Sequence, residues 1–414
     1  MKKGRVIKNV SFLLVWIGVF CFYACKELPS AEPFDPSNTR LHVVWSKPFY
    51  TDSSQATMLT PVVTDRYVAV IGDPYFSLTK SGNQIVVFDK SNGEWHPAWK
   101  GGINVGFDVV DDLYYYATDF LVGGNNKDVL FYFSRKSLHA LSLSSGQSLW
   151  NFIHEGYFNY FYGFPTLLGS DILAIHYDFS NSYVNQYNSI TGKETNLFSF
   201  NGIAFNMQWA INEDNDTLFF FTDVWRNANC YCLTKDSIVW KCNLNNEYGE
   251  GTSFHPIIVE NKYVLFQQKA AISCVDFSTG KLIWEKNICC TDNSPILYYE
   301  GKVVVRPGWG NVSCYDVQNG NLLWKNIDLL VLEDNNLKMD AYKGNLYFTT
   351  RYGNIFNPSR LYCMSMTTGE VIWYDAGPNK GIFGSLTIDQ ETGYLYCHSR
   401  WSVMCVDLNK TQKK

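Results

Sequence analysis

The fold prediction rests first on the segment Val275 to Trp284, V-D-F-S-T-G-K-L-I-W. Its first residues alternate between apolar and polar, Thr279-Gly280 makes a turn, and Leu282-Ile283-Trp284 begins a second apolar run. Alternation that ends at a Gly-containing turn predicts a β-hairpin. The stretch therefore predicts two antiparallel strands joined at Gly280.

The same pattern returns along the chain. A Gly lies four residues before a Trp in three further stretches, Ser142–Trp150, Asp316–Trp324 and Ser365–Trp373. Outer strands of this kind carry an aromatic residue at eight places, namely Trp45, Trp99, Trp150, Phe198, Trp240, Trp284, Trp324 and Trp373. Units of about 40–54 residues that each hold four short strands, here named A to D, are typical of propeller blades.

The two ends of the chain decide how the repeats close. Leu41–Trp45 has the pattern of a D strand, but no A, B or C strand precedes it. Met404–Asp407 has the pattern of a C strand with almost nothing after it. The first strand is therefore predicted to complete the last blade, which removes the open sheet edges. We predict an all-β fold, a single eight-bladed β-propeller over residues 41–409, in which Leu113–Phe120 forms the A strand of the second blade.

The N-terminus resembles a bacterial lipoprotein signal. A basic start is followed by the apolar run Val10–Tyr23 and then by Ala24-Cys25. We expect residues 1–24 to be a signal peptide, Cys25 to be lipidated, residues 25–40 to be a flexible tether and residues 410–414 a tail. An ordinary signal peptide cleaved elsewhere, or an uncleaved anchor, is the alternative.

Composition favours strands and an acidic body. Aromatic residues make up 16% and charged residues 18% of the 414 residues. The formal charge is −5, and the first 24 residues contribute four positive charges, so the remainder carries −9. An acidic body of this kind is not expected to bind nucleic acid.

The hairpin motif resembles a known repeat. A C strand that ends in a-L-D-x-x-T-G-k-x-x-W is similar to the PQQ-like propeller repeats, which are related to the quinoprotein alcohol dehydrogenases; Val275–Trp284 and Tyr315–Trp324 match it well. Together with the signal, the ring looks most like the propeller lipoprotein of the outer-membrane β-barrel assembly machinery. That resemblance implies a monomeric, non-catalytic scaffold without a cofactor, lipid-anchored in the bacterial envelope at the outer membrane and bound to other envelope proteins.

Several cysteines share one position in the repeat. Cys274, Cys314 and Cys363 each lie six residues before the turn Gly of their blade, and Cys230 and Cys405 occupy the same phase. This is a small-residue position in strand C, where a Cys acts as a small apolar side chain. We expect these five residues to be buried free thiols.

Cys289-Cys290 is the one hint of an enzyme. The pair lies in a loop between a D and an A strand, where quinoprotein dehydrogenases have a vicinal pair against PQQ. The residues that follow, Thr291-Asp292-Asn293, do not match that family, and no set of oxygen ligands for Ca²⁺ is recognisable. The seven His residues show no zinc-binding spacing. A PQQ-dependent oxidoreductase is therefore kept as the second hypothesis.

The loops between B and C strands carry most of the arginines. Five of the eight Arg outside the signal follow a B strand, and three Trp accompany them: Arg135, Trp225, Arg226, Arg306, Trp309, Arg351, Arg400 and Trp401. B–C and D–A loops share one face of a propeller, so these residues predict a cationic and aromatic partner-binding face. The alternative for each is packing between blades. A third hypothesis is a surface lipoprotein that binds glycans through this face.

Overall fold

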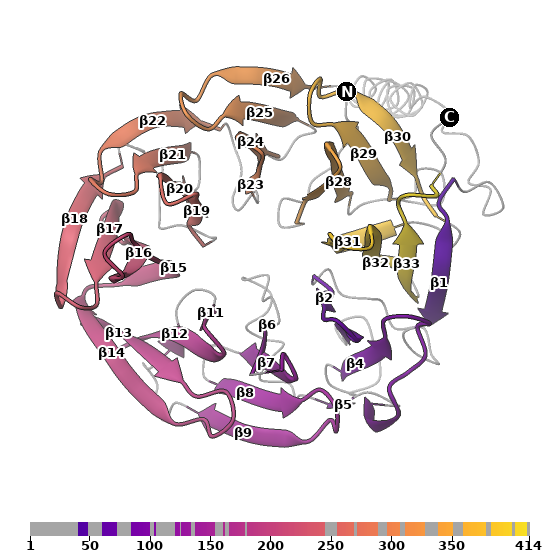
Figure 1. Cartoon of the computed structure of the whole chain (residues 1–414), viewed down its shortest axis with the longest axis horizontal. Helices are drawn as coiled ribbons and strands as arrows, with labels where there is room; N and C mark the ends of the chain where they lie inside the picture. Colours follow the sequence, from indigo (N-terminus) through magenta and orange to yellow (C-terminus); the bar gives the residue numbers. More distant parts are fainter. Residues whose placement is uncertain are drawn as a thin grey trace, which may run out of the picture.

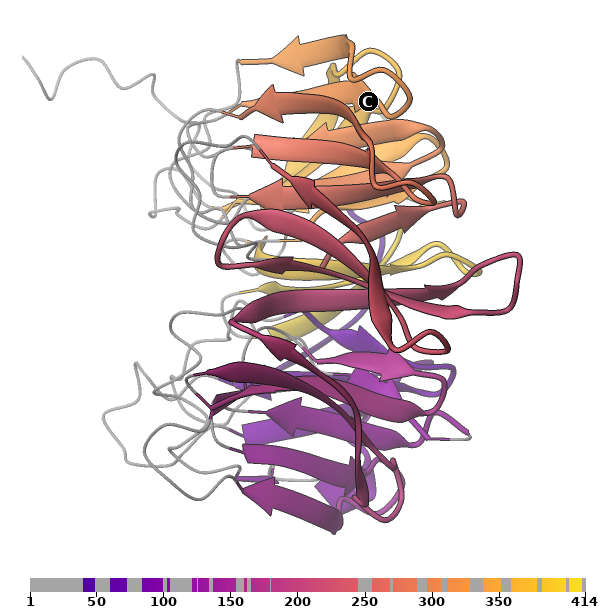
Figure 2. The ribbon, with the colours of Figure 1, turned by 90° about the vertical axis from the view of Figure 1, so that its left-hand side faces the viewer.

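The chain folds into a closed ring of blades. The computed structural model describes residues 40–48, 60–72, 84–99, 103–104, 121–124, 126–133, 137–153, 160–161, 165–178, 180–244, 255–268, 271–288, 296–306, 311–327, 338–350, 359–377, 382–399 and 402–411. Figure 1 shows their strands as a ring seen along its axis, and Figure 2 shows that the strands run from one face of the disc to the other. The predicted eight-bladed β-propeller is confirmed, since the strands form eight antiparallel sheets.

Blades 1 to 4 occupy the first half of the ring. Blade 1 has β2 (Val62–Val63), β3 (Tyr67–Gly72), β4 (Gln84–Asp89) and β5 (Ile103–Asn104). Blade 2 has β6 (Leu121–Gly123), β7 (Val129–Phe133), β8 (Ser137–Ser142) and β9 (Ser148–Ile153). Blade 3 has β10 (Tyr160–Phe161), β11 (Thr166–Leu168), β12 (Asp171–Tyr177), β13 (Asn181–Tyr187) and β14 (Glu194–Asn201). Blade 4 has β15 (Ala204–Ile211), β16 (Thr217–Asp223), β17 (Asn227–Cys232) and β18 (Ser237–Asn243).

Blades 5 to 8 complete the ring. Blade 5 has β19 (Ile257–Val259), β20 (Tyr263–Gln268), β21 (Ala271–Asp276) and β22 (Leu282–Asn287). Blade 6 has β23 (Ile296–Tyr299), β24 (Lys302–Val305), β25 (Val312–Asp316) and β26 (Leu322–Asn326). Blade 7 has β27 (Asp340–Tyr342), β28 (Asn345–Thr349), β29 (Leu361–Ser365) and β30 (Val371–Asp375). Blade 8 has β31 (Ile382–Asp389), β32 (Tyr394–Ser399), β33 (Ser402–Asp407) and β1 (Val43–Pro48).

Blade 8 is closed by the start of the chain, as predicted. β1 pairs antiparallel with β33, with Trp45 opposite Cys405 and Ser46 opposite Met404. The amide of Asp407 also donates to the carbonyl of His42 at 2.9 Å. In Figure 1 the indigo β1 lies beside the yellow β33, so the two ends of the ring are joined by a β-ladder.

The apolar core is divided among the joints between blades. The buried apolar residues form eight clusters, and each cluster combines side chains of two consecutive blades. One cluster, for example, joins Cys274 and Trp284 of blade 5 to Val303 and Val317 of blade 6. A blade alone would therefore expose both of its faces, which explains why the fold needs the whole ring.

A tryptophan ties each of six blades to the next. Its indole N–H donates to a backbone carbonyl in the C–D turn of the following blade, at 2.7 to 3.1 Å. The six pairs are Trp45–Lys90, Trp99–Leu143, Trp150–Ser189, Trp240–Phe277, Trp284–Val317 and Trp324–Met366. The Trp of the repeat is therefore a structural residue that links two blades.

The turn glycine makes room for that tryptophan. Gly320 has a φ of +68°, and a Cβ on it would lie 2.7 Å from the ring of Trp284. Gly93, Gly192, Gly280 and Gly369 stand in the same relation to the Trp of the preceding blade. The Gly of the T-G-x-x-x-W pattern is therefore required for two reasons. The turn has a left-handed backbone conformation, and an indole ring of the preceding blade lies too close for a side chain.

The joint between blades 3 and 4 departs from this pattern in both partners. Phe198 replaces the Trp, and Asp236, with a φ of +47°, stands where the turn Gly would be. Phe198 instead stacks on Tyr231 with ring centroids 3.8 Å apart, and the Tyr231 hydroxyl donates to Asp236. Without an indole over the turn, a side chain is accommodated at the Gly position.

One predicted strand position is wrong. Trp99 lies in a 3-10 turn, η1 (Pro97–Trp99), and the outer strand of blade 1 is the short β5. Pro97 lacks the N–H that a strand ladder needs, so the chain leaves the sheet there, although the Trp99 indole still reaches Leu143. In blade 2, β6 pairs with β7, and the predicted A strand Leu113–Phe120 lies outside the described residues.

Substitution of a turn glycine tests the Trp–Gly contact. Gly320→Ala is expected to lower the free energy of unfolding by about 2–4 kcal/mol, because the new methyl group meets the Trp284 ring and the φ is left-handed. Gly301→Ala is the matched control, since Gly301 has a φ of +78° and no atom within 4 Å of the added Cβ. Urea denaturation of both variants gives their free energies of unfolding. The loss in Gly301→Ala measures the effect of the left-handed φ, and the additional loss in Gly320→Ala measures the effect of the indole contact. Equal losses would show that the indole contributes nothing.

Candidate functional site

Three of the residues predicted for the partner-binding face lie in the described part of the chain. They are Trp225 and Arg226 in the B–C turn of blade 4, and Arg306 at the end of β24. The other candidate site residues lie outside the described residues: Cys25, Arg135, Cys289, Cys290, Trp309, Arg351, Arg400 and Trp401.

Arg306 is an interior residue. Its side chain is 1% exposed, and its Nη1 donates to the carbonyl of Thr349 in blade 7 at 2.8 Å. The guanidinium also lies 5.3 Å from the centroid of the Phe348 ring. Arg306 therefore joins blades 6 and 7 and is not available on the loop face, which corresponds to the packing alternative for this position.

Trp225 is the most exposed large apolar side chain in the described part of the chain. It is 71% exposed and lies at the tip of the three-residue turn between β16 and β17. Arg226 follows it with a φ of +65°, and the Arg226 amide closes the turn by donating to the carbonyl of Asp223 at 3.0 Å. The turn thus holds an indole in solvent on the face of the B–C and D–A loops.

A buried carboxylate fixes this turn from below. Asp223 is completely buried, and its Oδ1 accepts from the Asn227 amide at 2.9 Å. The side-chain amide of Asn227 donates to both Asp223 oxygens at 2.9 Å, and that of Asn229 donates to Oδ2 at 3.3 Å. The Nζ of Lys241, on β18, lies 3.4 Å from the Asp223 Oδ2. A carboxylate that accepts this many hydrogen bonds holds its turn in one conformation.

Backbone bonds to the neighbouring D–A segments hold the same turn from both sides. The Val224 amide donates to the carbonyl of Ile203 at 3.2 Å, and the Leu244 amide donates to the carbonyl of Arg226 at 3.0 Å. Gly202 lies under the indole, since a Cβ on it would be 4.0 Å from the Trp225 Nε1. The turn, the segment before β15 and the segment after β18 therefore form one rigid surface unit.

The sequence did not reveal the residues that build this unit. The unit is built by one carboxylate, Asp223, and two side-chain amides, Asn227 and Asn229. They lie in an otherwise apolar pair of strands, and none belongs to a known motif. A usable signal was the spacing of an Asp four residues before an Asn across a short turn, which is the pattern of a side chain that caps a turn.

The described cysteines are buried free thiols, as predicted. Cys274, Cys314 and Cys405 are completely buried, and burial raises the pKa of each of these thiols to about 12. Cys230 and Cys363 are likewise free and buried. A thiol with a pKa this high stays protonated at neutral pH, so these side chains act as apolar packing groups. Among the described residues no group of His, Cys, Asp and Glu could hold a metal ion.

The chain is similar to proteins of the PQQ-like propeller repeat family. A family model described as outer membrane protein assembly factor BamB matches residues 227–412. Among solved structures, BamB from Moraxella catarrhalis is 13% identical, with a TM-score of 0.58 over 89% of this chain and 100% of that chain. The quinohemoprotein alcohol dehydrogenase ADHIIG from Pseudomonas putida HK5 is 12% identical, with a TM-score of 0.62 over 93% of this chain and 79% of that chain. No curated protein matches the sequence.

A third solved structure, the computationally designed protein Ika8, is 12% identical, with a TM-score of 0.62 over 89% of this chain and 100% of that chain. At these identities the likeness concerns the fold. The resemblance to PQQ-like propeller repeats is thus confirmed, and what the chain does depends on its loops.

Removal of the buried carboxylate tests whether the Trp225 turn is preorganised. Asp223→Ala is expected to lower the free energy of unfolding by about 2–3 kcal/mol, because it leaves buried Asn227 and Asn229 donors without their acceptor. Asp214→Ala, in an exposed turn of the same blade, is the control and should change stability by less than about 0.5 kcal/mol. Urea denaturation measures both. A loss no larger than that of the control would show that Asp223 does not hold the turn.

Proposed function

From the match of residues 227–412 to the assembly-factor family, we propose that this chain is a non-catalytic protein-binding scaffold of the bacterial envelope. The observation that carries the proposal is the exposed Trp225 on a turn fixed by Asp223. An indole in solvent costs free energy that a partner recovers by covering it.

The chemistry of the turn suits a partner-binding hot spot. Trp and Arg are the residue types that contribute most to protein interfaces, and here Trp225 and Arg226 are adjacent. Because Asp223 already fixes the turn, little conformational entropy is lost when a partner binds. Arg135, Trp309, Arg351, Arg400 and Trp401 extend this surface in the proposal, since their places in the repeat put them in loops of the same face.

We further propose that a lipid on Cys25 anchors the propeller to the outer membrane. The apolar run before Ala24-Cys25 supports this proposal, and residues 25–40 provide the tether between lipid and ring. The proposed protein is a monomer, with one ring for each anchor.

A PQQ-dependent oxidoreductase is the second candidate. It is favoured by the Cys289-Cys290 pair and by the likeness in fold to the alcohol dehydrogenase. Addition of PQQ and Ca²⁺ to the purified protein separates the two candidates, because a quinoprotein acquires quinone absorbance and dye-linked alcohol oxidation, whereas a scaffold acquires neither.

Replacement of the lipidation site tests the anchor. Cys25→Ala is expected to move the protein from the membrane fraction to the soluble fraction, since the ring then has no lipid. Cys274→Ala, which changes a buried thiol, should leave the protein in the membrane. Fractionation of the source bacterium after carbonate washing measures this. Retention of the Cys25→Ala variant in membranes would contradict lipid anchoring at this residue.

Replacement of the exposed indole tests the partner-binding face. Trp225→Ala is expected to weaken co-purification of envelope partners about tenfold or more, because a buried Trp at an interface contributes about 2 kcal/mol or more. Ile190→Ala is the matched control, since Ile190 is 52% exposed in a C–D turn on the opposite face. Quantitative pull-down from solubilised membranes measures both variants. An unchanged partner set with a folded Trp225→Ala protein would remove this turn from the interface.

A further inference from the structure

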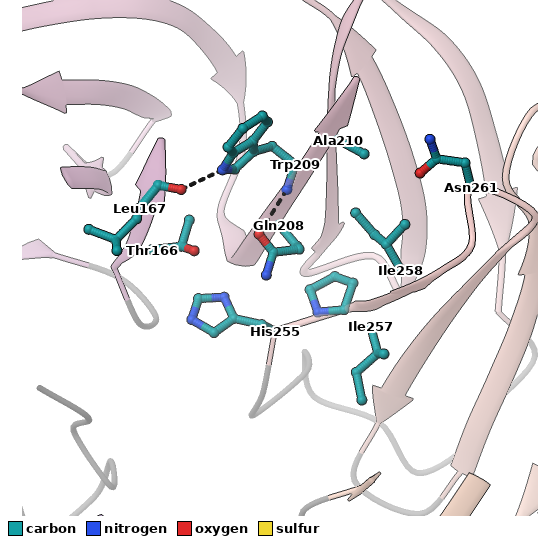
Figure 3. A pocket seen from close by; sticks show the side chains of 10 residues that line it. Thr166, Leu167, Gln208, Trp209, Ala210, His255, Ile257, Ile258 and Asn261 are labelled. Carbon is teal, nitrogen blue, oxygen red and sulfur yellow. Dashed lines mark hydrogen bonds between the residues drawn. The ribbon is translucent and has the colours of Figure 1, made fainter. Parts of the chain in front are cut away.

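An open pocket of about 660 Å³ lies among the inner strands of blades 3, 4 and 5. β11, β15 and β19 contribute Thr166, Gln208, Trp209 and Ile257 to its wall, and the segment before β19 contributes His255 (Figure 3). A volume of this size is in the range of small-molecule sites, which are mostly apolar with a few placed polar groups.

The pocket is built by hydrogen bonds that cross between blades. The Trp209 indole N–H donates to the carbonyl of Leu167 in blade 3. The His255 Nδ1 lies 2.7 Å from the carbonyl of Met207 in blade 4, and the Asn261 side-chain amide donates to the carbonyl of Ile211 at 3.0 Å. Each of these side chains is therefore fixed against a backbone carbonyl of the preceding blade.

A strained irregularity in β15 lies directly beside the pocket. The β15–β16 register shifts between Phe205 and Gln208, and Asn206 within that bulge has a φ of +30°. Bulges and left-handed residues other than Gly are unfavourable and concentrate at functional sites, where they redirect a side chain. Here the bulge turns the Met207 carbonyl toward His255. It also places the Gln208 side chain at the pocket wall.

The orientation of Gln208 is settled by its own neighbour. Its Oε1 accepts from the Trp209 amide at 3.1 Å, so the NH₂ group is turned away from Trp209, toward His255, as Figure 3 shows. The indole N–H of Trp209 already donates to the carbonyl of Leu167. The Trp209 side chain therefore offers a ligand only its ring carbons. The pocket thus combines an amide donor, the Thr166 hydroxyl and the Asn261 carbonyl oxygen with an aliphatic wall.

Among the described residues that line the pocket, none is Asp, Glu, Lys or Arg. The lining therefore offers a charged ligand no carboxylate, ammonium or guanidinium partner, and His255 is its one ionisable side chain. We propose that this pocket binds a neutral sugar, whose hydroxyls both donate and accept hydrogen bonds and whose C–H faces pack against Trp209 and Ile257. The site is separate from the Trp225 turn, so it does not depend on the proposed scaffold function.

The test is titration of the purified protein with glucose, N-acetylglucosamine and a panel of further neutral hexoses, with glucuronate as the charged comparator. Calorimetry should show saturable binding of at least one neutral sugar and weaker binding of glucuronate. Gln208→Ala should weaken that binding about fivefold, the effect of one lost hydrogen bond. Ile257→Trp, which fills the pocket, should abolish it.

Gln147→Ala, in an exposed turn of blade 2, is the control and should bind as the wild type does. Circular dichroism verifies that each variant is folded, and Gln208→Ala alone decides the outcome if Ile257→Trp does not fold. The proposal is overturned if no neutral sugar of the panel binds saturably, if binding is insensitive to the substitutions in the pocket, or if glucuronate binds more tightly than every neutral sugar.

Discussion

The ring depends on one repeated contact, the indole of an outer strand lying over the turn glycine of the next blade. At Trp284 this contact combines a hydrogen bond to the Val317 carbonyl with a ring so close to Gly320 that no side chain fits between them. Since each apolar cluster is shared between two blades, the contact sets the position of both halves of that cluster. At the joint between blades 3 and 4, both the Trp and the turn Gly are replaced, by Phe198 and Asp236.

A scaffold held together at its rim leaves both loop faces and the inner strands for function. The described strands bury their apolar residues between blades. Trp225 illustrates the consequence. Its turn is stabilised by Asp223 beneath it and by backbone bonds beside it, while the indole itself lies in solvent. Arg306 occupies a similar place in the repeat but is used to join two blades.

The inner strands show a second use of the same architecture. Hydrogen bonds from Trp209, His255 and Asn261 join consecutive blades near the ring axis, as the outer tryptophans do at the rim. They also fix polar side chains around an open pocket. The register shift of β15 lies beside this pocket, where the Met207 carbonyl meets His255.

The repeat, the number of blades, the closure by β1 and the burial of the strand C cysteines could all be predicted from the sequence, because each follows from a local period and from the two chain ends. The remaining features depend on contacts between blades. The tertiary structure placed Trp99 in a 3-10 turn, Arg306 inside and Trp225 outside, and it assembled the Asp223 network and the β15 pocket. The physical reason is that the exposure and partners of a loop or inner-strand residue are set by the neighbouring blade, whose contacts are not encoded in the residue's own repeat.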